Sequence, residues 1–244
     1  MQEPVLILGA RSDIARACAH VFAKKGHSIQ LAARNAVELG DDAVDLRLRY
    51  GVEVTCHEFD ALDIHGHPSF LDSLQTLPVI AICTVGTMGA QDLSEIDATA
   101  ALRDIRSNFE GPAMIMAALA NLFEARGSGT LVGISSVAGL RGRATNYTYG
   151  AAKAGFTAFL SGMRNRLTKK GIHVVTVLPG FVDTAMTADL DLPGPLTAQP
   201  SEVAQAIATA VVKKRNVIYV GWIWRWIMIV ICNIPEGIFK KLDI

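Results

Sequence analysis

The 244-residue sequence has no excess of either charge and no closely spaced pair of cysteines. It carries 23 Lys and Arg residues against 23 Asp and Glu residues, so no overall field attracts nucleic acid, and we expect no nucleic-acid partner. The absence of a Cys-x-x-Cys motif argues against a disulfide framework and predicts buried thiols in a reducing compartment, the cytoplasm. The cysteines are Cys18, Cys56, Cys83 and Cys232. An apolar strand pattern already covers residues 4–8, so no signal peptide is expected.

Long apolar runs are also missing, with one partial exception near the C-terminus. Residues 217–234 are almost entirely apolar and contain all three tryptophans, but Gly221 and Arg225 interrupt them. The run falls short of the ~20 residues that a membrane-spanning helix needs, so no transmembrane segment is expected. Residues 213–244 carry six basic and two acidic residues. Residues 217–244 are therefore expected to form an apolar, basic tail, either at the inner face of the plasma membrane or in the interface of a homo-oligomer.

The remaining composition is that of a globular protein, with 50% apolar and 19% charged residues. Short apolar runs alternate with longer amphipathic ones. This alternation predicts an α/β fold, in which one doubly wound parallel sheet of the Rossmann type has helices on both faces. We expect a single domain over residues 1–244, with a substrate loop at residues 183–200. Strands are expected at residues 5–8, 28–32, 53–58, 79–84, 129–134, 173–178 and 216–220, and the main helices at residues 14–25, 36–50, 98–126, 149–170 and 201–214.

One stretch, residues 136–153, predicts a reaction. Tyr149 and Lys153 are four residues apart in a helical pattern, which places their side chains on one face of the helix, one turn from each other. A nearby ammonium group stabilises a phenolate, so Lys153 is expected to lower the pKa of Tyr149 from ~10. Ser136, thirteen residues before the tyrosine, can donate a second hydrogen bond to the same oxygen. The pattern predicts a site that delivers a proton to a carbonyl oxygen.

Glycine is scarce in the turn where a dinucleotide cofactor would need it. The turn after the first strand contains only one glycine, which allows backbone amides to approach a pyrophosphate at the start of the next helix. The turn would equally suit an ordinary connection, so this prediction depends on the rest of the chain. The residues expected to hold the pyrophosphate are Gly9, Arg11, Ser12, Asp13 and Ile14.

The end of the second strand favours NADP(H) over NAD(H). No acid is present there for the ribose 2′-hydroxyl of NAD(H), whereas Arg34 suits the 2′-phosphate of NADP(H), with Arg11 as a second candidate. NAD(H) stays the alternative, because a solvated arginine at a strand end is common. Asp60, followed by Ala61, ends the third strand and is expected beside the adenine amino group. Gly86 follows the fourth strand and permits a close approach of the cofactor.

Together these residues resemble the short-chain dehydrogenase/reductase family over essentially the whole chain. The matching positions are Gly9, Ile14, Asp60, Gly86, Asn108, Ser136, Tyr149, Lys153 and the segment Pro179-Gly180-x-Val182-x-Thr184. The resemblance implies that Tyr149 donates the proton, that Lys153 lowers its pKa and holds the nicotinamide ribose, and that Ser136 orients the carbonyl. It implies that Asn108 completes the catalytic set by supporting a water beside Lys153. Pro179, Gly180, Val182 and Thr184 would then lie against the nicotinamide, and no metal is implied.

Two segments depart from the family pattern. Asp13 and Ala15 stand where the family has its second and third glycines. A carboxylate repels a pyrophosphate unless it points away or caps the helix, and we expect Asp13 to cap the helix. The family's Asn-Asn-Ala-Gly run is replaced by Thr84-Val85-Gly86, which is expected to weaken strand support without changing the chemistry.

Several segments are similar to one subgroup, the decaprenylphosphoryl-2-keto-pentose reductases, which reduce a keto sugar on a polyprenyl phosphate. These segments are the turn at residues 9–15, residues 59–68 and the tail at residues 225–242. The similarity implies a lipid-linked ketone as substrate, and makes Arg141 and Arg143 candidates to contact its phosphate. The alternatives are a reductase of soluble ketones or 3-oxoacyl thioesters whose tail lies in a tetramer interface, and a non-catalytic, cofactor-binding scaffold at the membrane.

Overall fold

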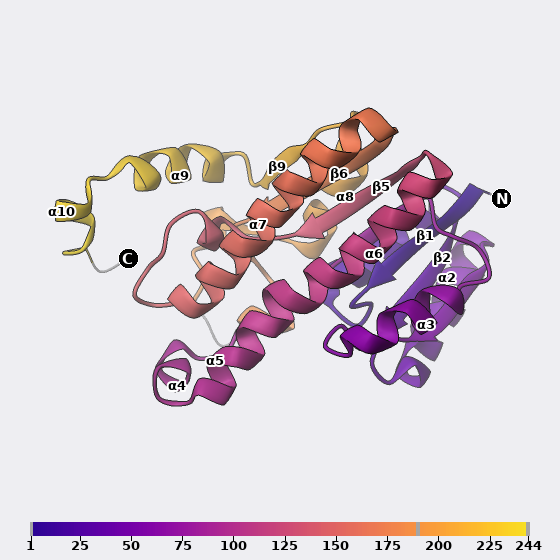
Figure 1. Ribbon diagram of the computed structural model, residues 1–244, viewed down its shortest axis with the longest axis horizontal. Coiled ribbons are helices and arrows are strands. Elements are labelled where there is room, and N and C mark those ends of the chain that lie inside the picture. The colour runs from indigo at the N-terminus through magenta and orange to yellow at the C-terminus, as the bar shows by residue number, and fades with distance from the viewer. Residues whose placement is uncertain (1, 189–190, 243–244) are drawn as a thin grey trace.

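The computed structural model describes residues 2–188 and 191–242, and its centre is a seven-stranded sheet in the order β3-β2-β1-β4-β5-β6-β9 (Figure 1). All six neighbouring pairs are parallel. The strands are β1 (Gln2–Leu8), β2 (His27–Ala33), β3 (Val54–Glu58), β4 (Ile80–Cys83), β5 (Gly129–Ile134), β6 (Ile172–Pro179) and β9 (Val217–Val220). The direction of winding reverses between β1 and β4, which in such sheets is where ligands bind. The predicted doubly wound α/β fold is confirmed.

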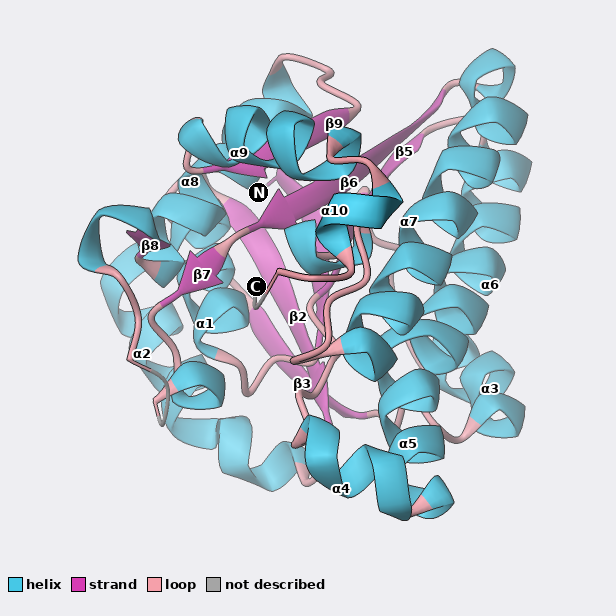
Figure 2. Cartoon of the chain, turned by 90° about the vertical axis from the view of Figure 1, so that its left-hand side faces the viewer, coloured by secondary structure: helices cyan, strands magenta, loops and turns pink. Residues whose placement is uncertain are grey.

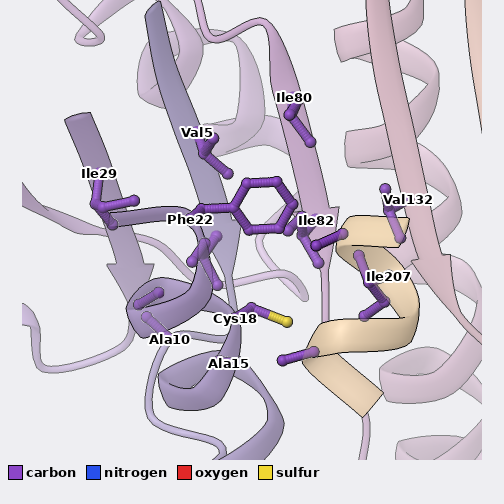
Figure 3. Close-up of a cluster of buried hydrophobic side chains, with 14 of the residues drawn as sticks. Val5, Ala10, Ala15, Cys18, Phe22, Ile29, Ile80, Ile82, Val132 and Ile207 are labelled. Carbon is purple, nitrogen blue, oxygen red and sulfur yellow. The ribbon is translucent and has the colours of Figure 1, made fainter. Parts of the chain in front are cut away.

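Helices cover both faces of the sheet because successive strand residues point to opposite sides. Val5 and Ile7 pack with α1, α2 and α8, whereas Leu6 and Leu8 pack with α3, α6 and α7. Figure 3 shows the first of these layers, in which Phe22 of α1 lies near Val5 and Ile82 and Ile207 of α8 lies near Ile82 and Val132. The helices are α1 (Asp13–Ala23), α2 (Gly40–Tyr50), α3 (His67–Asp72), α4 (Gln91–Ile96), α5 (Ala98–Ile105), α6 (Gly111–Arg126), α7 (Tyr147–Leu167), α8 (Pro200–Val212), α9 (Ile223–Asn233) and α10 (Glu236–Phe239).

The segment predicted as one helix over residues 98–126 is divided. A π-helical turn, Arg106–Glu110, joins α5 to α6. Such a turn inserts an extra residue into the helical ladder and is common at functional sites. Here the π-helical turn contains Asn108, which is the catalytic residue predicted in this segment.

The tail folds into the last strand and two helices. After β9, the chain forms α9 and α10, which extend beyond the sheet in Figure 1 and lie in front of it in Figure 2. The short strands β7 (Phe181–Val182) and β8 (Thr197–Ala198) pair at the two ends of the predicted substrate loop. Residues 189–190 of that loop and residues 243–244 of the tail lie outside the described residues.

The prediction that all four cysteines are buried is wrong for two of them. Cys18 and Cys83 are buried, but Cys56 and Cys232 are exposed, and none forms a disulfide. Cys56 lies on β3, the edge strand of the sheet, and Cys232 lies near the end of α9, where its thiol donates to the Leu140 carbonyl at 3.5 Å. Positions on an edge strand or on an outlying helix are covered on fewer sides than positions in the core.

Candidate active site

The turn between β1 and α1 has the conformation that a pyrophosphate site requires. Gly9 has a φ of +81°, and a β-carbon there would lie 2.9 Å from the Thr84 hydroxyl oxygen. Ser12 caps α1 by accepting a hydrogen bond from the Ala15 amide at 3.2 Å. The amides of Asp13 and Ile14 donate to no acceptor among the described residues. Two free amides at a helix N-terminus are the donors that bind a phosphate group.

Asp13 does not cap α1, contrary to the expectation, because Ser12 occupies that position. Its carboxylate instead accepts a hydrogen bond of 2.9 Å from the Ala185 amide. Asp13 therefore joins the start of α1 to the predicted substrate loop, 172 residues later in the chain. This hydrogen bond engages the carboxylate with the loop, while its negative charge stays near the start of α1.

Threonine replaces the strand support that the missing asparagines would give. The Thr84 hydroxyl donates to the Leu8 carbonyl at 2.9 Å and accepts from the Ser12 hydroxyl at 3.1 Å. The side chain thereby connects β4, the end of β1 and the cap of α1. These two contacts replace the strand support that the asparagines of the family pattern would give.

A second cavity of about 360 Å³ lies over the ends of β1, β2 and β3. Arg34, Asp60 and Ala61 line it, together with Gly9. Arg34 is exposed and has no ion-pair partner in the part of the chain that the structure describes. Arg11, the second candidate for a 2′-phosphate, is paired with Glu38 at 2.6 Å. Of the two arginines, Arg34 is therefore the one available to an anionic ligand.

The π-helical turn places Asn108 in the centre of the site. Asn108 is fully buried, donates to the carbonyls of Thr87 and Asp104 at 2.7 and 2.9 Å, and accepts from the Thr87 amide at 3.2 Å. A β-carbon on Gly86 would lie 2.7 Å from the Asn108 oxygen and 3.1 Å from Lys153 Nζ. Glycine is thus required at position 86, because any β-carbon there would crowd both of these side chains.

Ser136, Tyr149 and Lys153 converge on the main cavity, which has a volume of about 420 Å³. Ser136 follows β5 and accepts a hydrogen bond from the Ala138 amide at 3.1 Å. Lys153 is buried and donates to the Ile134 carbonyl at 3.1 Å, while its Nζ lies 5.7 Å from the centre of the Tyr149 ring. All three residues, and Asn108, line this one cavity.

The pKa values of Tyr149 and Lys153 are shifted in opposite directions. Burial raises the pKa of Tyr149 to about 12, against a lowering by its hydrogen bond with Ser136, and the charge of Asp104 raises it further. Burial lowers the pKa of Lys153 to about 8. The expectation that Tyr149 has a lowered pKa is therefore wrong in this arrangement. Desolvation of the phenol outweighs an ammonium group whose hydrogen bond goes to a backbone carbonyl.

The segment after β6 forms the opposite wall of the main cavity. Pro179, Gly180, Val182 and Thr184 all line it. The Thr187 hydroxyl donates to the Val182 carbonyl at 2.6 Å and accepts from the Thr184 amide at 3.2 Å. The main and second cavities share Arg11, Ser12, Thr84 and Gly86. They form one trough along the carboxyl ends of the strands, as expected for a dinucleotide and a substrate bound side by side.

Comparison with known proteins agrees with this geometry. The family model for short chain dehydrogenases matches residues 3–193. An uncharacterized oxidoreductase of Mycobacterium tuberculosis is 35% identical over 242 residues, which cover 98% of this chain and 96% of the relative. The chain belongs to the short-chain dehydrogenase family. It is accordingly an oxidoreductase of that type.

Solved structures of short-chain dehydrogenases superimpose on nearly the full length of the chain. A short-chain dehydrogenase from Sphingobium yanoikuyae, in complex with NADPH, has a TM-score of 0.81 and 27% identity, and the match covers 99% of this chain and 96% of that one. The bulky-bulky ketone specific alcohol dehydrogenase from Comamonas testosteroni has a TM-score of 0.80 and 26% identity, with coverage of 99% and 95%.

The tail of this short-chain dehydrogenase contributes Trp224 to the wall of the main cavity, a contact that the sequence did not identify. Trp224 is 5% exposed, lines the cavity and donates to the Leu196 carbonyl at 3.0 Å. Its indole lies directly against Gly180, which leaves no room for a β-carbon there. Its ring also meets Phe181 edge to face at 5.3 Å. Neither spacing nor composition could reveal a contact between segments more than forty residues apart.

A second contact fixes α10 to the loop before α7. Arg141 pairs with Glu236 at 2.5 Å, and its guanidinium lies 4.2 Å from the centre of the Phe239 ring. Arg141 is thus engaged with the tail, and it does not line either cavity. Among the described residues, no helix is long and apolar enough to cross a bilayer.

Proposed function

We propose that the protein is an NADP(H)-dependent reductase of a ketone, with Tyr149 as the proton donor. The observation that carries this proposal is the convergence of Asn108, Ser136, Tyr149 and Lys153 on one cavity. The same cavity receives the free amides of Asp13 and Ile14. NADPH, when bound, supplies the hydride, and a protonated acid must supply the proton that completes the alcohol.

Each of the four side chains has a separate role in the reduction of the substrate's carbonyl group. Tyr149 is protonated at neutral pH because its pKa is raised, so its hydroxyl donates to the carbonyl oxygen as negative charge develops there. Ser136 donates a second hydrogen bond to that oxygen. The Lys153 ammonium, one helical turn away, stabilises the phenolate that Tyr149 becomes. Asn108 holds the Thr87 backbone and keeps the space beside Gly86 and Lys153 in shape.

The second cavity fits the adenosine half of NADP(H). In this proposal Arg34, which has no ion-pair partner among the described residues, binds the 2′-phosphate, and Asp60 and Ala61 lie against the adenine. The backbone at Val182 and the hydroxyl of Thr184 would bind the nicotinamide carboxamide. The NADPH complex of the Sphingobium yanoikuyae relative supports the same choice of cofactor.

We propose an amphiphilic ketone, such as a keto sugar on a polyprenyl carrier, as the substrate. The tail supports this, because Trp224 lines the cavity while neighbouring tail side chains present an exposed apolar surface. An apolar carrier chain could leave the cavity along that surface. The same surface supports the proposal that the protein contacts the inner face of the plasma membrane.

A soluble, bulky ketone is the second candidate. The Comamonas testosteroni relative is specific for bulky-bulky ketones, and a cavity of about 420 Å³ accommodates a substrate of that kind. A 3-oxoacyl thioester would also fit this class. In that case the apolar tail surface would be the interface of a homo-oligomer.

The test is NADPH oxidation by the Tyr149→Phe variant in the presence of a bulky ketone. Loss of the proton donor should lower kcat by about a hundredfold or more, with an unchanged Kd for NADPH. Tyr147→Phe is the matched control, because Tyr147 lies on the same helix but is 47% exposed and outside the cavity. Retained turnover in Tyr149→Phe, or equal losses in both variants, would refute the assignment.

A further inference from the structure

Two polar atoms in the main cavity have no hydrogen-bond partner. They are Arg143 Nε and Asn146 Oδ1, which are both buried and both unsatisfied among the described residues. Arg143 and Asn146 line the cavity together with Ser136 and Tyr149. An unsatisfied buried polar atom is costly and calls for an explanation, such as a ligand group that completes its bonding.

The side chain of Asn146 makes no capping hydrogen bond, because the side chain of Gln91 binds the first turn of the helix instead. Asn146 lies at the N-cap position of α7, where an asparagine side chain normally accepts a hydrogen bond from the first turn of the helix. Here Asn146 makes no such bond. The amide of Thr148 is taken by the side chain of Gln91, from α4, at 3.0 Å. The capping contact is thus supplied from outside the helix, and the Asn146 amide stays available to the cavity.

Of the two arginines in the loop before α7, Arg143 is the one whose side chain has no ion pair or hydrogen bond among the described residues. Arg141 is held by Glu236 and Phe239 of the tail, but no ion pair or hydrogen bond occupies the guanidinium of Arg143 in the described chain. Two other arginines that line the cavity, Arg11 and Arg16, are paired with Glu38 and Asp42. Burial lowers the pKa of Arg143, yet a guanidinium stays charged at neutral pH. Its positive charge therefore faces the cavity without a counter-ion.

We propose that Arg143 forms a subsite for an anionic oxygen group carried by the substrate near its ketone, and that the Asn146 side-chain oxygen accepts a hydrogen bond from a hydroxyl of the same substrate. A guanidinium binds phosphate and carboxylate oxygens through paired hydrogen bonds, and the Asn146 oxygen accepts from a neighbouring hydroxyl. The anion is either the phosphodiester of a lipid-linked sugar or the phosphate or carboxylate of a soluble ketone. The inference rests on the proposed function, since it places this group in the cavity where Tyr149 meets the carbonyl.

The test is a binding titration that does not depend on turnover. The protein saturated with NADP⁺ is titrated with phenyl phosphate and, separately, with benzyl alcohol, and the tryptophan fluorescence, to which Trp224 in the cavity wall contributes, reports binding. Phenyl phosphate should bind to Arg143→Gln about tenfold more weakly, as expected on losing a charged hydrogen bond, whereas benzyl alcohol should bind equally well. Asn146→Asp should reproduce the loss, because a carboxylate beside Arg143 neutralises it. The control is Arg103→Gln, an exposed arginine on α5 outside both cavities.

The outcomes separate the subsite from the proposed reaction. Equal binding of phenyl phosphate by wild type and Arg143→Gln, or no binding by the wild type, would overturn the subsite. A parallel loss of NADPH affinity in Arg143→Gln would overturn it too, by assigning the arginine to the cofactor. If phenyl phosphate binds more weakly to Arg143→Gln than to the wild type but the protein reduces no ketone, the subsite would be supported and the proposed reductase activity refuted. Tighter binding of geranyl phosphate than of phenyl phosphate would identify a lipid-borne anion, and the reverse order a soluble one.

Discussion

Tyr149 and Lys153 are close in space, but their protonation equilibria are shifted in opposite directions. Burial raises the pKa of the phenol to about 12 and lowers that of the ammonium group to about 8. At neutral pH the tyrosine therefore carries its proton and the lysine carries its charge. This is the combination that a proton donor in carbonyl reduction needs, and it arises from desolvation of both groups.

The first residue-scale prediction concerns pH. We expect kcat/KM for ketone reduction to fall as the pH rises through about 8, the pKa of Lys153. Above that pH the lysine is neutral and no longer stabilises the phenolate, whereas Tyr149, with a pKa of about 12, keeps its proton over the same range. The measurement is kcat/KM from about pH 6 to about pH 10, with a thermal melt at each pH as the control for unfolding. A profile that stays level throughout would contradict this role of the lysine charge.

The second residue-scale prediction concerns the choice of cofactor. Arg34→Ala removes the exposed arginine that is free to bind a 2′-phosphate. The ratio of NADH to NADPH dissociation constants should fall by about tenfold, the value of one charged hydrogen bond. Both constants are measured by fluorescence titration. Arg49→Ala is the control, because Arg49 lies on α2, pairs with Asp45 and lines neither cavity. An unchanged ratio in Arg34→Ala would assign the preference to other residues.

Among secondary-structure elements, the strands and the catalytic helix could be predicted, and the contacts between distant segments could not. All seven strands of the sheet lie within two or three residues of the segments expected from the sequence, and the spacing of Tyr149 and Lys153 fixes their common helix face. The division at Asn108 was missed, because a π-helical turn leaves no signal in hydrophobic periodicity. The roles of Gln91 and Trp224 depend on tertiary contacts that only the folded chain displays.

The hydrogen bond between Asp13 and Ala185 leads to a prediction about two elements, α1 and the substrate loop. Asp13→Asn keeps an acceptor for the Ala185 amide but removes a negative charge near the pyrophosphate site, so it should bind NADPH more tightly with an unchanged KM for the ketone. Asp13→Ala loses the acceptor as well, and its KM for the ketone should rise by about tenfold. The two variants are compared in one steady-state assay. Equal ketone KM values in both would show that this contact does not position the loop.

The whole molecule joins a conventional sheet to an unusual tail. Its net charge is zero, yet the tail exposes Arg225, Lys240 and Lys241 beside apolar side chains. The acidic Glu236 is paired with Arg141. Within the described part of the tail, the most exposed apolar side chains are Trp222 at 76%, Val230 at 65% and Trp226 at 58%. Cations beside tryptophans suit an anionic lipid surface, whereas a two-fold contact between copies would bring like charges together.

The whole-molecule prediction therefore uses the double variant Trp226→Gln, Val230→Gln, which alters the exposed side of α9 and leaves the buried Trp224 and Met228 in place. Binding to vesicles that contain phosphatidylglycerol should fall by about tenfold or more, because each lost apolar side chain removes about 1.5 kcal/mol or more of burial in the lipid. Added salt should weaken the wild-type binding, since the neighbouring cations act through screened attraction. Co-sedimentation measures binding and light scattering measures particle size, with Leu48→Gln, an 81% exposed leucine on α2, as the control. The opposite result would be that the wild type does not bind vesicles and that the double variant dissociates into smaller particles. That result would identify this surface as a subunit interface and favour a soluble ketone as the substrate.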